Sequence, residues 1–330
     1  MNGSLYQQID QAIEQIQSGK VNEGLAQLQM VMSYAKEDPD LAFQLADIFY
    51  DLGHIDTTLT LLRDLEPFFD ELPTDMQIEV HTLRAEIMID MGQLDQAMDE
   101  LLSCNQLEPD HVRSAILLAD IYLMQNMPEI ACRYLEGILE ENPDEQDVAF
   151  ILSEIYTDMG EWEKALFLLE DLAESEYRNK VKLSKGKILS QIGRFEEAYT
   201  FFQQALEEDL LSNDALLGCA VTSLQLDYTD ETILHCDKLI ELDQDHLGAY
   251  QVKGEALQKE NRLDEARLVF EQALTRNNQE EAILLKLIEV SYLLADLDEA
   301  ERYLQTLLEL DDENESALQW KNRLIDRIIN

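Results

Sequence analysis

Hydrophobic and polar residues recur along the chain with the spacing of amphipathic helices, and the same arrangement returns at a longer interval. Segments such as EWEKALFLLEDL, RFEEAYTFFQQAL and RLDEARLVFEQAL carry apolar side chains three and four positions apart. This is the period of a helix with one buried face. A second stretch of the same kind precedes each segment, so the pattern predicts pairs of helices along the whole chain rather than strands.

A turn residue opens the second helix of every predicted pair. These turns lie 34 residues apart, except for one interval of 33 and one of 39. Most of them are Gly, Asn or Asp, which tolerate the positive φ that a chain adopts where a helix ends and reverses. The predicted turn residues are Gly19, Gly53, Gly92, Asn126, Gly160, Gly193, Asp227, Asn261 and Ala295.

Two columns of small side chains accompany the turns, one before each turn and one after it. Because larger side chains would hold two backbones apart, small residues at two fixed places predict that the paired helices cross closely. The column before the turn contains Ala12, Ala46, Ala85, Ala119, Ser153, Gly186, Ala220 and Gly254, and is broken by Ile288. The column after the turn contains Gly24, Thr58, Ala97, Ala131, Ala165, Ala198, Thr232, Ala266 and Ala300.

Composition agrees with a helical protein that has a packed core. The chain has 330 residues, of which 46% are hydrophobic, with only 12 Gly and 6 Pro. A single globular core of this length would be large, so a repeat array is the simpler interpretation. Cys104, Cys132, Cys219 and Cys236 show no CxxC or Cys/His ligand spacing, and we expect them to be reduced packing residues.

The 34-residue period, the paired small columns and the helix-ending Pro109 and Pro143 resemble the tetratricopeptide repeat (TPR) family. The resemblance covers nearly the whole chain. It implies an all-α fold, a right-handed superhelical solenoid of antiparallel helical hairpins, and a bacterial cytosolic protein. Thr58 and Thr232 stand where the family has Ala, so we expect the two repeats that contain them to be packed more loosely.

The repeats divide the chain into one array and one additional helix. Residues 1–314 are expected to form nine TPR-like repeats in a single solenoid, followed by a capping helix at 315–330 with one polar face. The repeats are expected to begin near residues 5, 39, 78, 112, 146, 179, 213, 247 and 281.

One interval between turns is five residues longer than the usual 34, and the excess falls in LEPFFDELPTD. Pro67 and Pro73 stop a helix there and leave Phe68, Phe69 and Leu72 in a connection. These apolar side chains either fold back over the widened seam, which we favour, or form a contact point for a partner.

No motif of a common enzyme, nucleotide or zinc site occurs in the sequence. GxxxxGK[ST], GxGxxG, GxSxG and HExxH are absent. Asp243, Asp245 and Gly248 imitate the start of a calcium loop, but Gly254 occupies the closing position, which requires a bidentate Glu. We therefore expect no enzyme activity, no metal and no cofactor.

The net charge restricts the classes of partner. The chain has 24 Lys and Arg against 69 Asp and Glu, a formal net charge of −45, which disfavours binding to a phosphate backbone. No basic stretch precedes an apolar run at the N-terminus, and no segment offers about 18 consecutive apolar residues. We expect a cytoplasmic protein that binds no nucleic acid and does not insert into membranes.

Acidic residues are concentrated on one face of the first helices. In the TPR family, the first helices line the concave surface, where partners usually bind as extended or helical peptides. Across the second to fifth repeats, ten of twelve positions on this face are acidic, the exceptions being Arg113 and Met124. The acidic positions are Asp40, Asp47, Asp51, Glu79, Glu86, Asp90, Asp120, Asp147, Glu154 and Asp158.

Apolar side chains are interleaved with these acidic rows. They are Phe43, Tyr50, Ile89, Ile116, Leu123 and Phe150. An apolar stripe with acidic rows beside it would bind a Lys/Arg-rich or amphipathic segment of a protein partner. Alternatively, the carboxylates form a solvated face and the apolar residues pack between hairpins. The family's clamp for acidic peptide tails needs Lys, Arg and Asn on this surface, where this chain has acids.

A basic island interrupts the acidic pattern, and it consists of Arg178, Lys180, Lys182, Lys185 and Lys187. We expect Lys187 to lie beside Glu154 and Lys180 beside Asp147. The island either pairs charges across the seam between repeats or recognises an acidic group that fixes the register of a bound chain.

Together these features predict an interaction scaffold or adaptor. The candidate binding residues are the ten acidic positions, the six apolar side chains and Lys187. A peptide-sensing regulatory protein and a non-catalytic subunit of an enzyme complex are the alternatives.

Overall fold

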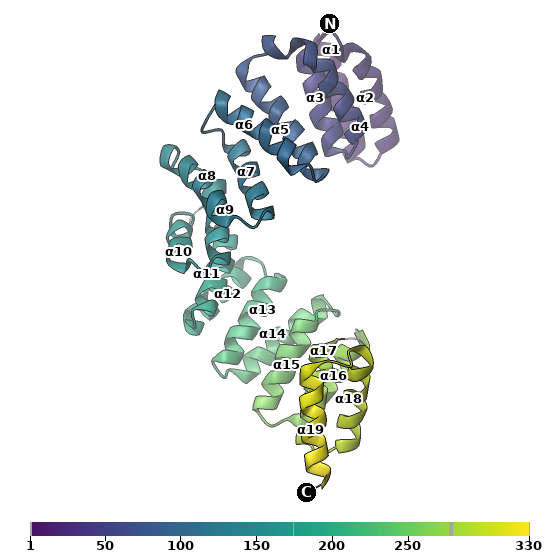
Figure 1. Cartoon of the computed structure of the whole chain (residues 1–330), viewed down its shortest axis with the longest axis vertical. Helices are drawn as coiled ribbons and strands as arrows, with labels where there is room; N and C mark the ends of the chain where they lie inside the picture. Colours follow the sequence, from purple (N-terminus) through teal and green to yellow (C-terminus); the bar gives the residue numbers. More distant parts are fainter. Residues whose placement is uncertain (1, 174, 277–279, 330) are drawn as a thin grey trace. The chain divides into compact units, whose positions relative to one another are not determined.

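The predicted turns fold the chain into consecutive helical hairpins. The computed structural model describes residues 2–173, 175–276 and 280–329, and within these ranges the regular structure is helical, without strands (Figure 1). All nine predicted turn residues have positive φ, from 57° at Asn261 to 88° at Gly19. Even Ala295 adopts a φ of 61°, a conformation that costs energy for a residue with a Cβ. The position in the repeat therefore sets the backbone there.

The helices fall into two units, Met1–Ile155 and Tyr156–Asn330. In unit 1, α1 (Asn2–Gln17) packs on α2 (Val21–Ala35), α3 (Pro39–Asp51) on α4 (Ile55–Leu65), α5 (Thr74–Asp90) on α6 (Leu94–Leu107), and α7 (Val112–Met124) on α8 (Pro128–Glu141). Helix α9 (Gln146–Asp158) begins in this unit.

Unit 2 continues the same arrangement. After α10 (Trp162–Asp171), the pairs are α11 (Arg178–Gln191) with α12 (Phe195–Glu208), α13 (Asn213–Gln225) with α14 (Thr229–Leu242), α15 (Leu247–Lys259) with α16 (Leu263–Arg276), and α17 (Glu281–Leu293) with α18 (Leu297–Leu310). The last helix, α19 (Glu315–Ile329), packs on α17 and α18.

Both columns of small residues are buried where the paired helices cross. Ala46 and Ala97, one from each column, have no accessible surface. A Cβ at Gly254 would collide with the Phe270 ring, which is itself fully buried. The crossing is therefore filled by a bulky side chain of one helix over a small residue of the other.

Thr58 and Thr232 are as fully buried as the alanines of their column, so the expectation of looser packing at these two positions is wrong. The Thr58 hydroxyl has the carbonyl oxygens of Ala46 and His54 at 3.3 Å, and the Thr232 hydroxyl lies 3.0 Å from the Tyr228 carbonyl. A buried hydroxyl with a backbone acceptor carries little penalty.

The long interval forms a 3-10 helix, η1 (Glu66–Glu71), between α4 and α5. Phe68 and Phe69 are half-buried against the core of the first hairpins, and Leu72 is buried. The Phe69 ring also meets the His81 ring edge-on, with centroids 4.9 Å apart. The segment folds back over the seam, as we favoured, because its apolar side chains find partners within unit 1.

All four cysteines are free and buried. Burial raises the pKa of the Cys219 and Cys236 thiols to about 12. These thiols stay protonated at neutral pH and act as small apolar packing groups, as the sequence predicted.

Candidate functional site

Two side-chain links join the acidic faces of α3, α5 and α7. The Tyr50 hydroxyl on α3 donates a hydrogen bond to Asp90 Oδ2 on α5, at 2.9 Å. Arg113 on α7 holds both carboxylate oxygens of Glu86 on α5, with hydrogen bonds of 3.0 and 2.8 Å. It also donates to Glu79 at 3.2 Å. Three successive first helices thus share one connected polar surface.

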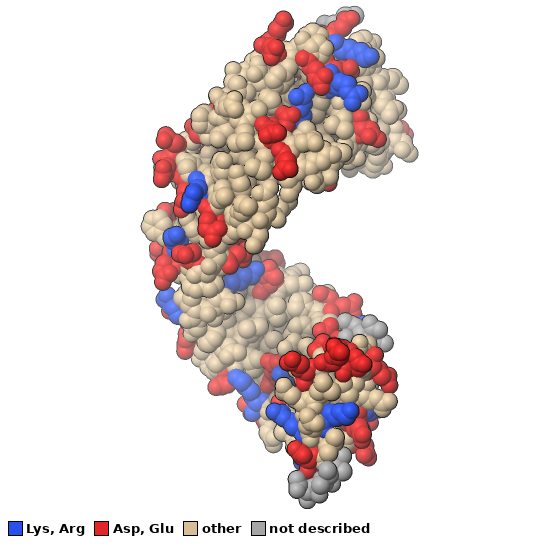
Figure 2. All heavy atoms as spheres, viewed as in Figure 1, with Lys and Arg blue, Asp and Glu red and all other residues tan. Residues whose placement is uncertain are grey.

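Several carboxylates on this surface are held in unfavourable surroundings. Burial is the main cause that raises the pKa of Asp47, Glu86 and Asp120. Neighbouring carboxylates raise the pKa of Asp47 and Glu86 further, while Arg113 lowers it. Acidic side chains also outnumber basic ones on the face drawn in Figure 2. A cation placed beside these carboxylates would stabilise their charged form.

A groove of about 680 Å³ opens beside Arg113, and we call it the α7 groove. Its walls come from α5, the first turns of α7, the start of α9 and the loops that precede α7 and α9. Apolar Val112, Ile116 and Leu117 line it together with His111 and Asn142. The five carboxylates that line it are Glu86, Glu108, Asp110, Glu145 and Asp147.

The local sequence explains why acids gather at this groove. Pro109 follows the end of α6 and Pro143 follows the end of α8, so neither helix continues into its loop. His111 then caps α7, because its Nδ1 accepts the backbone N–H of Ser114 at 3.3 Å. The acidic residues around each proline are left on loops at the groove edge instead of on a helix face.

The structure distributes the predicted binding residues unevenly. Glu86, Ile116 and Asp147 line the α7 groove. The exposed residues are Asp40, Asp51, Asp90, Asp147 and Glu154 in unit 1, and Asp158 and Lys187 in unit 2. The half-buried ones are Phe43, Asp47, Tyr50, Glu79, Glu86, Ile89, Ile116, Asp120 and Leu123.

The expected apolar stripe is not an open surface. Phe150 is only 7% exposed, and Phe43 and Tyr50 pack against the core of the first hairpins. Ile89 packs against a second core cluster, which contains Leu101. The expectation of a long exposed stripe is wrong, because these four of its six side chains fill contacts within the helical layers, as the alternative interpretation proposed.

Sequence reasoning also missed part of the groove. Glu108, Asp110, His111 and Glu145 lie at or beside the inter-helix loops, whereas the prediction followed only the faces of the first helices. The available signal was the pair of acidic loops EPDH and NPDE, one repeat apart.

The basic island forms ion pairs within unit 2. Arg178 and Lys182 both reach Glu208 Oε1, at 2.9 and 2.5 Å. Lys187 Nζ lies 3.6 Å from Asp214 Oδ2 on α13. The pairs of Lys187 with Glu154 and of Lys180 with Asp147 remain predictions.

Among the described residues, no group of three or more His, Cys, Asp or Glu side chains is arranged to hold a metal ion. None of the helices in the described ranges combines the length and the apolar content that a bilayer span requires.

The stacked hairpins define a helical-repeat protein, and the α7 groove gives it an acidic concave site. A family model described as a tetratricopeptide repeat-like domain matches residues 89–227, and one described as a tetratricopeptide repeat matches residues 257–323. The chain belongs to the tetratricopeptide repeat family.

Related chains carry the same repeat. The TPR repeat-containing protein YpiA of Bacillus subtilis (strain 168) is 24% identical over 309 residues, which cover 92% of this chain and 70% of YpiA. Tetratricopeptide repeat protein 21A of Mus musculus is 23% identical over 302 residues, covering 82% of this chain and 22% of the mouse protein. The chain spans only a small part of the mouse relative.

Solved structures share the fold. A tetratricopeptide repeat protein from Parabacteroides merdae matches with a TM-score of 0.57 and 18% identity, over 75% of this chain and 98% of that one. The APC/C hetero-tetramer Cut9–Hcn1 contains a chain that matches with a TM-score of 0.54 and 15% identity, over 90% and 59% of the two chains. These likenesses support a helical solenoid.

Proteins of this family are generally non-catalytic repeat scaffolds. Membership of the family supports a role for the chain as a scaffold for protein–protein interaction.

Proposed function

We propose that the chain is an adaptor whose α7 groove binds a Lys- or Arg-containing, amphipathic segment of a partner protein. The observation that carries the proposal is the lining of the groove: five carboxylates face one arginine and one histidine. Such a surface attracts cations and repels anions.

Arg113 does not neutralise the groove. Its guanidinium is already engaged by Glu86 and Glu79. Within the described residues, Glu108, Asp110 and Glu145 form no ion pair. A bound Lys or Arg side chain would be the counter-charge for this acidic edge. Each exposed pair contributes little alone, but several carboxylates around one groove also speed the approach of a basic segment.

The apolar part of the lining suits the rest of such a segment. Val112, Ile116 and Leu117 would contact the aliphatic stems of Lys and Arg or an interleaved apolar side chain. The groove volume of about 680 Å³ falls within the usual range of ligand sites. An amphipathic segment uses both kinds of lining at once.

Fluorescence anisotropy with two labelled peptides tests this function. One peptide alternates Lys and Arg with Leu and Trp, and the other replaces Lys and Arg by Glu. We expect the full-length chain to bind the basic peptide and not the acidic one. The affinity should fall as NaCl is raised from about 50 to about 300 mM, because salt screens exposed charges.

Matched charge reversals locate the binding. Glu108→Lys plus Glu145→Lys should weaken binding of the basic peptide by about tenfold or more. Asp70→Lys plus Asp99→Lys changes the net charge equally at exposed positions of unit 1 outside the groove, and it should have a small effect. Equal losses for the two double variants, or no binding by the wild type, would reject the groove as the site.

A further inference from the structure

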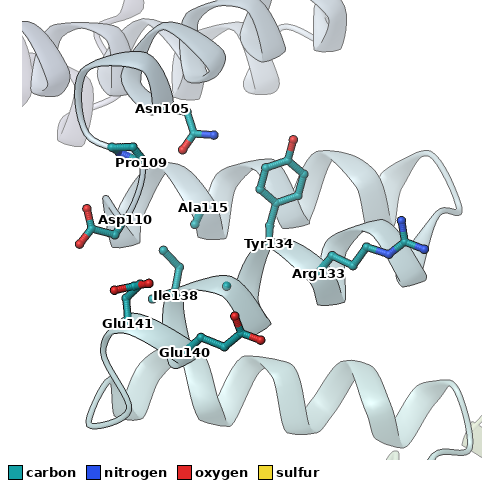
Figure 3. Close-up of a pocket in the computed structure, with 10 residues that line it drawn as sticks. Asn105, Pro109, Asp110, Ala115, Arg133, Tyr134, Ile138, Glu140 and Glu141 are labelled. Carbon is teal, nitrogen blue, oxygen red and sulfur yellow. The ribbon is translucent and has the colours of Figure 1, made fainter.

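A second hollow, of about 490 Å³, lies between α6 and α8, and we call it the α8 hollow (Figure 3). Its lining comes from α6, α8, the loop before α7 and one residue of α7. The lining residues are Asn105, Pro109, Asp110, Ala115, Arg133, Tyr134, Gly137, Ile138, Glu140 and Glu141. None of the binding residues predicted from the sequence lies in it.

Gly137 in α8 leaves space in this hollow, although no neighbouring atom would exclude a larger side chain there. A Cβ at Gly186 or Gly218 would collide with the Phe202 ring, and one at Gly254 would collide with Phe270, so packing explains those helical glycines. A Cβ at Gly137 would meet no atom within 4 Å. Glycine weakens a helix interior relative to alanine. The open surface over Gly137 therefore allows another chain to approach the α8 backbone closely.

The floor and one wall of the hollow are apolar and held in place. Ala115 and Ile138 are 5% and 3% exposed and form the floor. The Tyr134 ring stacks on Tyr122, with centroids 5.5 Å apart and an angle of 18° between the planes. An aromatic wall fixed in this way presents a rigid face to an apolar side chain.

Charges at the rim differ from one side to the other. Asp110 and Glu141 stand on one side, with Glu140 below them, whereas Arg133 extends away on the opposite side (Figure 3). Among the described residues, none of these four side chains takes part in an ion pair. The acidic side of the rim is complementary to a basic residue that flanks an apolar one.

Asp110 lines both the α7 groove and the α8 hollow. A short extended stretch of a bound chain that crosses the loop before α7 would pass from one to the other. We propose that the α8 hollow takes an apolar side chain of the same basic, amphipathic partner segment that occupies the α7 groove, with a flanking Lys or Arg at Asp110 and Glu141. This inference rests on the proposed function.

A bulky substitution at Gly137 tests the proposal without touching a core residue. Gly137→Phe fills the hollow at an exposed helix position, where a residue other than Gly favours the helix. Gln204→Phe, at the same repeat position of α12, is the matched control. Circular dichroism melting curves of both variants check that each folds like the wild type. If Gly137→Phe does not fold, Gly137→Lys, whose charge opposes a basic ligand, replaces it.

Two labelled peptides separate this site from the α7 groove. The first alternates Lys and Arg with Leu and Trp, and the second has the same Lys and Arg with Ser in place of Leu and Trp. Gly137→Phe should weaken binding of the first peptide by about tenfold and leave binding of the second unchanged. Glu108→Lys plus Glu145→Lys should weaken both, and Gln204→Phe neither.

Suppose that Gly137→Phe binds the first peptide as the wild type does, while Glu108→Lys plus Glu145→Lys still weakens peptide binding. This result overturns the α8 hollow as a binding site and leaves the proposed function standing. Equal weakening of both peptides by Gly137→Phe also overturns it, because the hollow would then not select the apolar side chain. If the wild type binds neither peptide, the proposed function fails and this inference fails with it.

Discussion

The two units pack their helices in the same way but differ in their ratio of basic to acidic residues and in the ion pairs that the lysines of their first helices form. Unit 1 has 6 Lys and Arg against 31 Asp and Glu, while unit 2 has 18 against 38. The first helices of unit 1 contain no lysine. In unit 2, five lysines on first helices pair with acids: Lys182 with Glu208, Lys187 with Asp214, Lys253 with Asp237, Lys259 with Asp227 and Lys286 with Glu255.

This difference shows that the repeat fixes the fold and leaves the surface free to vary. The buried columns are made of the same small residue types in both units, so the hairpins pack alike. Unit 2 pairs these five lysines with its own acids, four of them across neighbouring hairpins. Unit 1 leaves an acidic surface that a partner could neutralise.

Filling a helix crossing in unit 2 should have the largest effect. Gly254→Val places two methyl groups against the buried Phe270 ring, and overpacking of this kind should lower the stability of unit 2 by about 3 kcal/mol. Hydrogen exchange measured by mass spectrometry on the full chain would localise the loss to α15 and α16. Unchanged exchange in these helices would show that the crossing has room for a larger residue.

Removing Arg113, the arginine that lines the α7 groove, should destabilise unit 1. Arg113→Met leaves the half-buried Glu86 without its bidentate partner, which should cost about 1–2 kcal/mol. Adding Glu86→Gln to the same chain should restore part of the loss, and a double-mutant cycle in urea unfolding measures the coupling. Arg194→Met breaks the exposed pair with Glu197 in unit 2 and should change little. Additive effects of Arg113→Met and Glu86→Gln would contradict the link.

Mild acid should weaken unit 2 through His235. Burial, and to a lesser degree Lys238, lowers the pKa of His235, while Glu231 opposes the shift. The Tyr199 hydroxyl, 3.4 Å from Nε2, faces it from α12. Below about pH 6.5, the ordinary pKa of histidine, the His235 imidazole is protonated in the unfolded chain but stays neutral in the folded chain until the pH reaches its lowered pKa. Stability therefore falls as the pH drops towards the lowered folded pKa.

The acidic surface of unit 1 should respond in the opposite direction. Because the folded pKa values of Asp47, Glu86 and Asp120 are raised, the folded state binds protons at higher pH than the unfolded state does. This contribution to stability grows as the pH falls from neutral towards the ordinary values of 3.8 and 4.5. After correction for the intrinsic exchange rate, hydrogen exchange should be slower in unit 1 and faster in unit 2 at pH 5 than at pH 7. In His235→Phe, the faster exchange of unit 2 at pH 5 should disappear. If it persists, His235 is excluded as the cause.

The smallest effect is expected at the open glycine of unit 1. Gly137→Ala should stabilise α8 by about 0.5–1 kcal/mol, since the added methyl group meets no neighbour and the residue favours the helix. Urea unfolding of the full chain measures the gain. A loss of stability instead would mean that the space over Gly137 is filled within the chain itself.

The sequence was sufficient to predict the hairpins, because the repeat constrains backbone and packing together. A positive φ at Asn126 or Ala295 and a buried Ala at a crossing follow from position alone. Whether Phe43 and Phe150 are exposed or packed could not be predicted in this way. An apolar residue on the inner face of a first helix is compatible with an open stripe and equally with a contact between helices. The groove edge at Glu108 and Glu145 was also hidden, because loop side chains come together only in three dimensions.

A hydrogen-exchange footprint of the bound peptide tests the central claim most directly. The full chain is measured with and without a saturating amount of the peptide that alternates Lys and Arg with Leu and Trp. We expect slower exchange in residues 105–150, around the α7 groove, and unchanged exchange throughout unit 2, where five first-helix lysines already pair with acids. Protection that falls on unit 2 instead, or is spread evenly over both units, would contradict a located acidic site in unit 1.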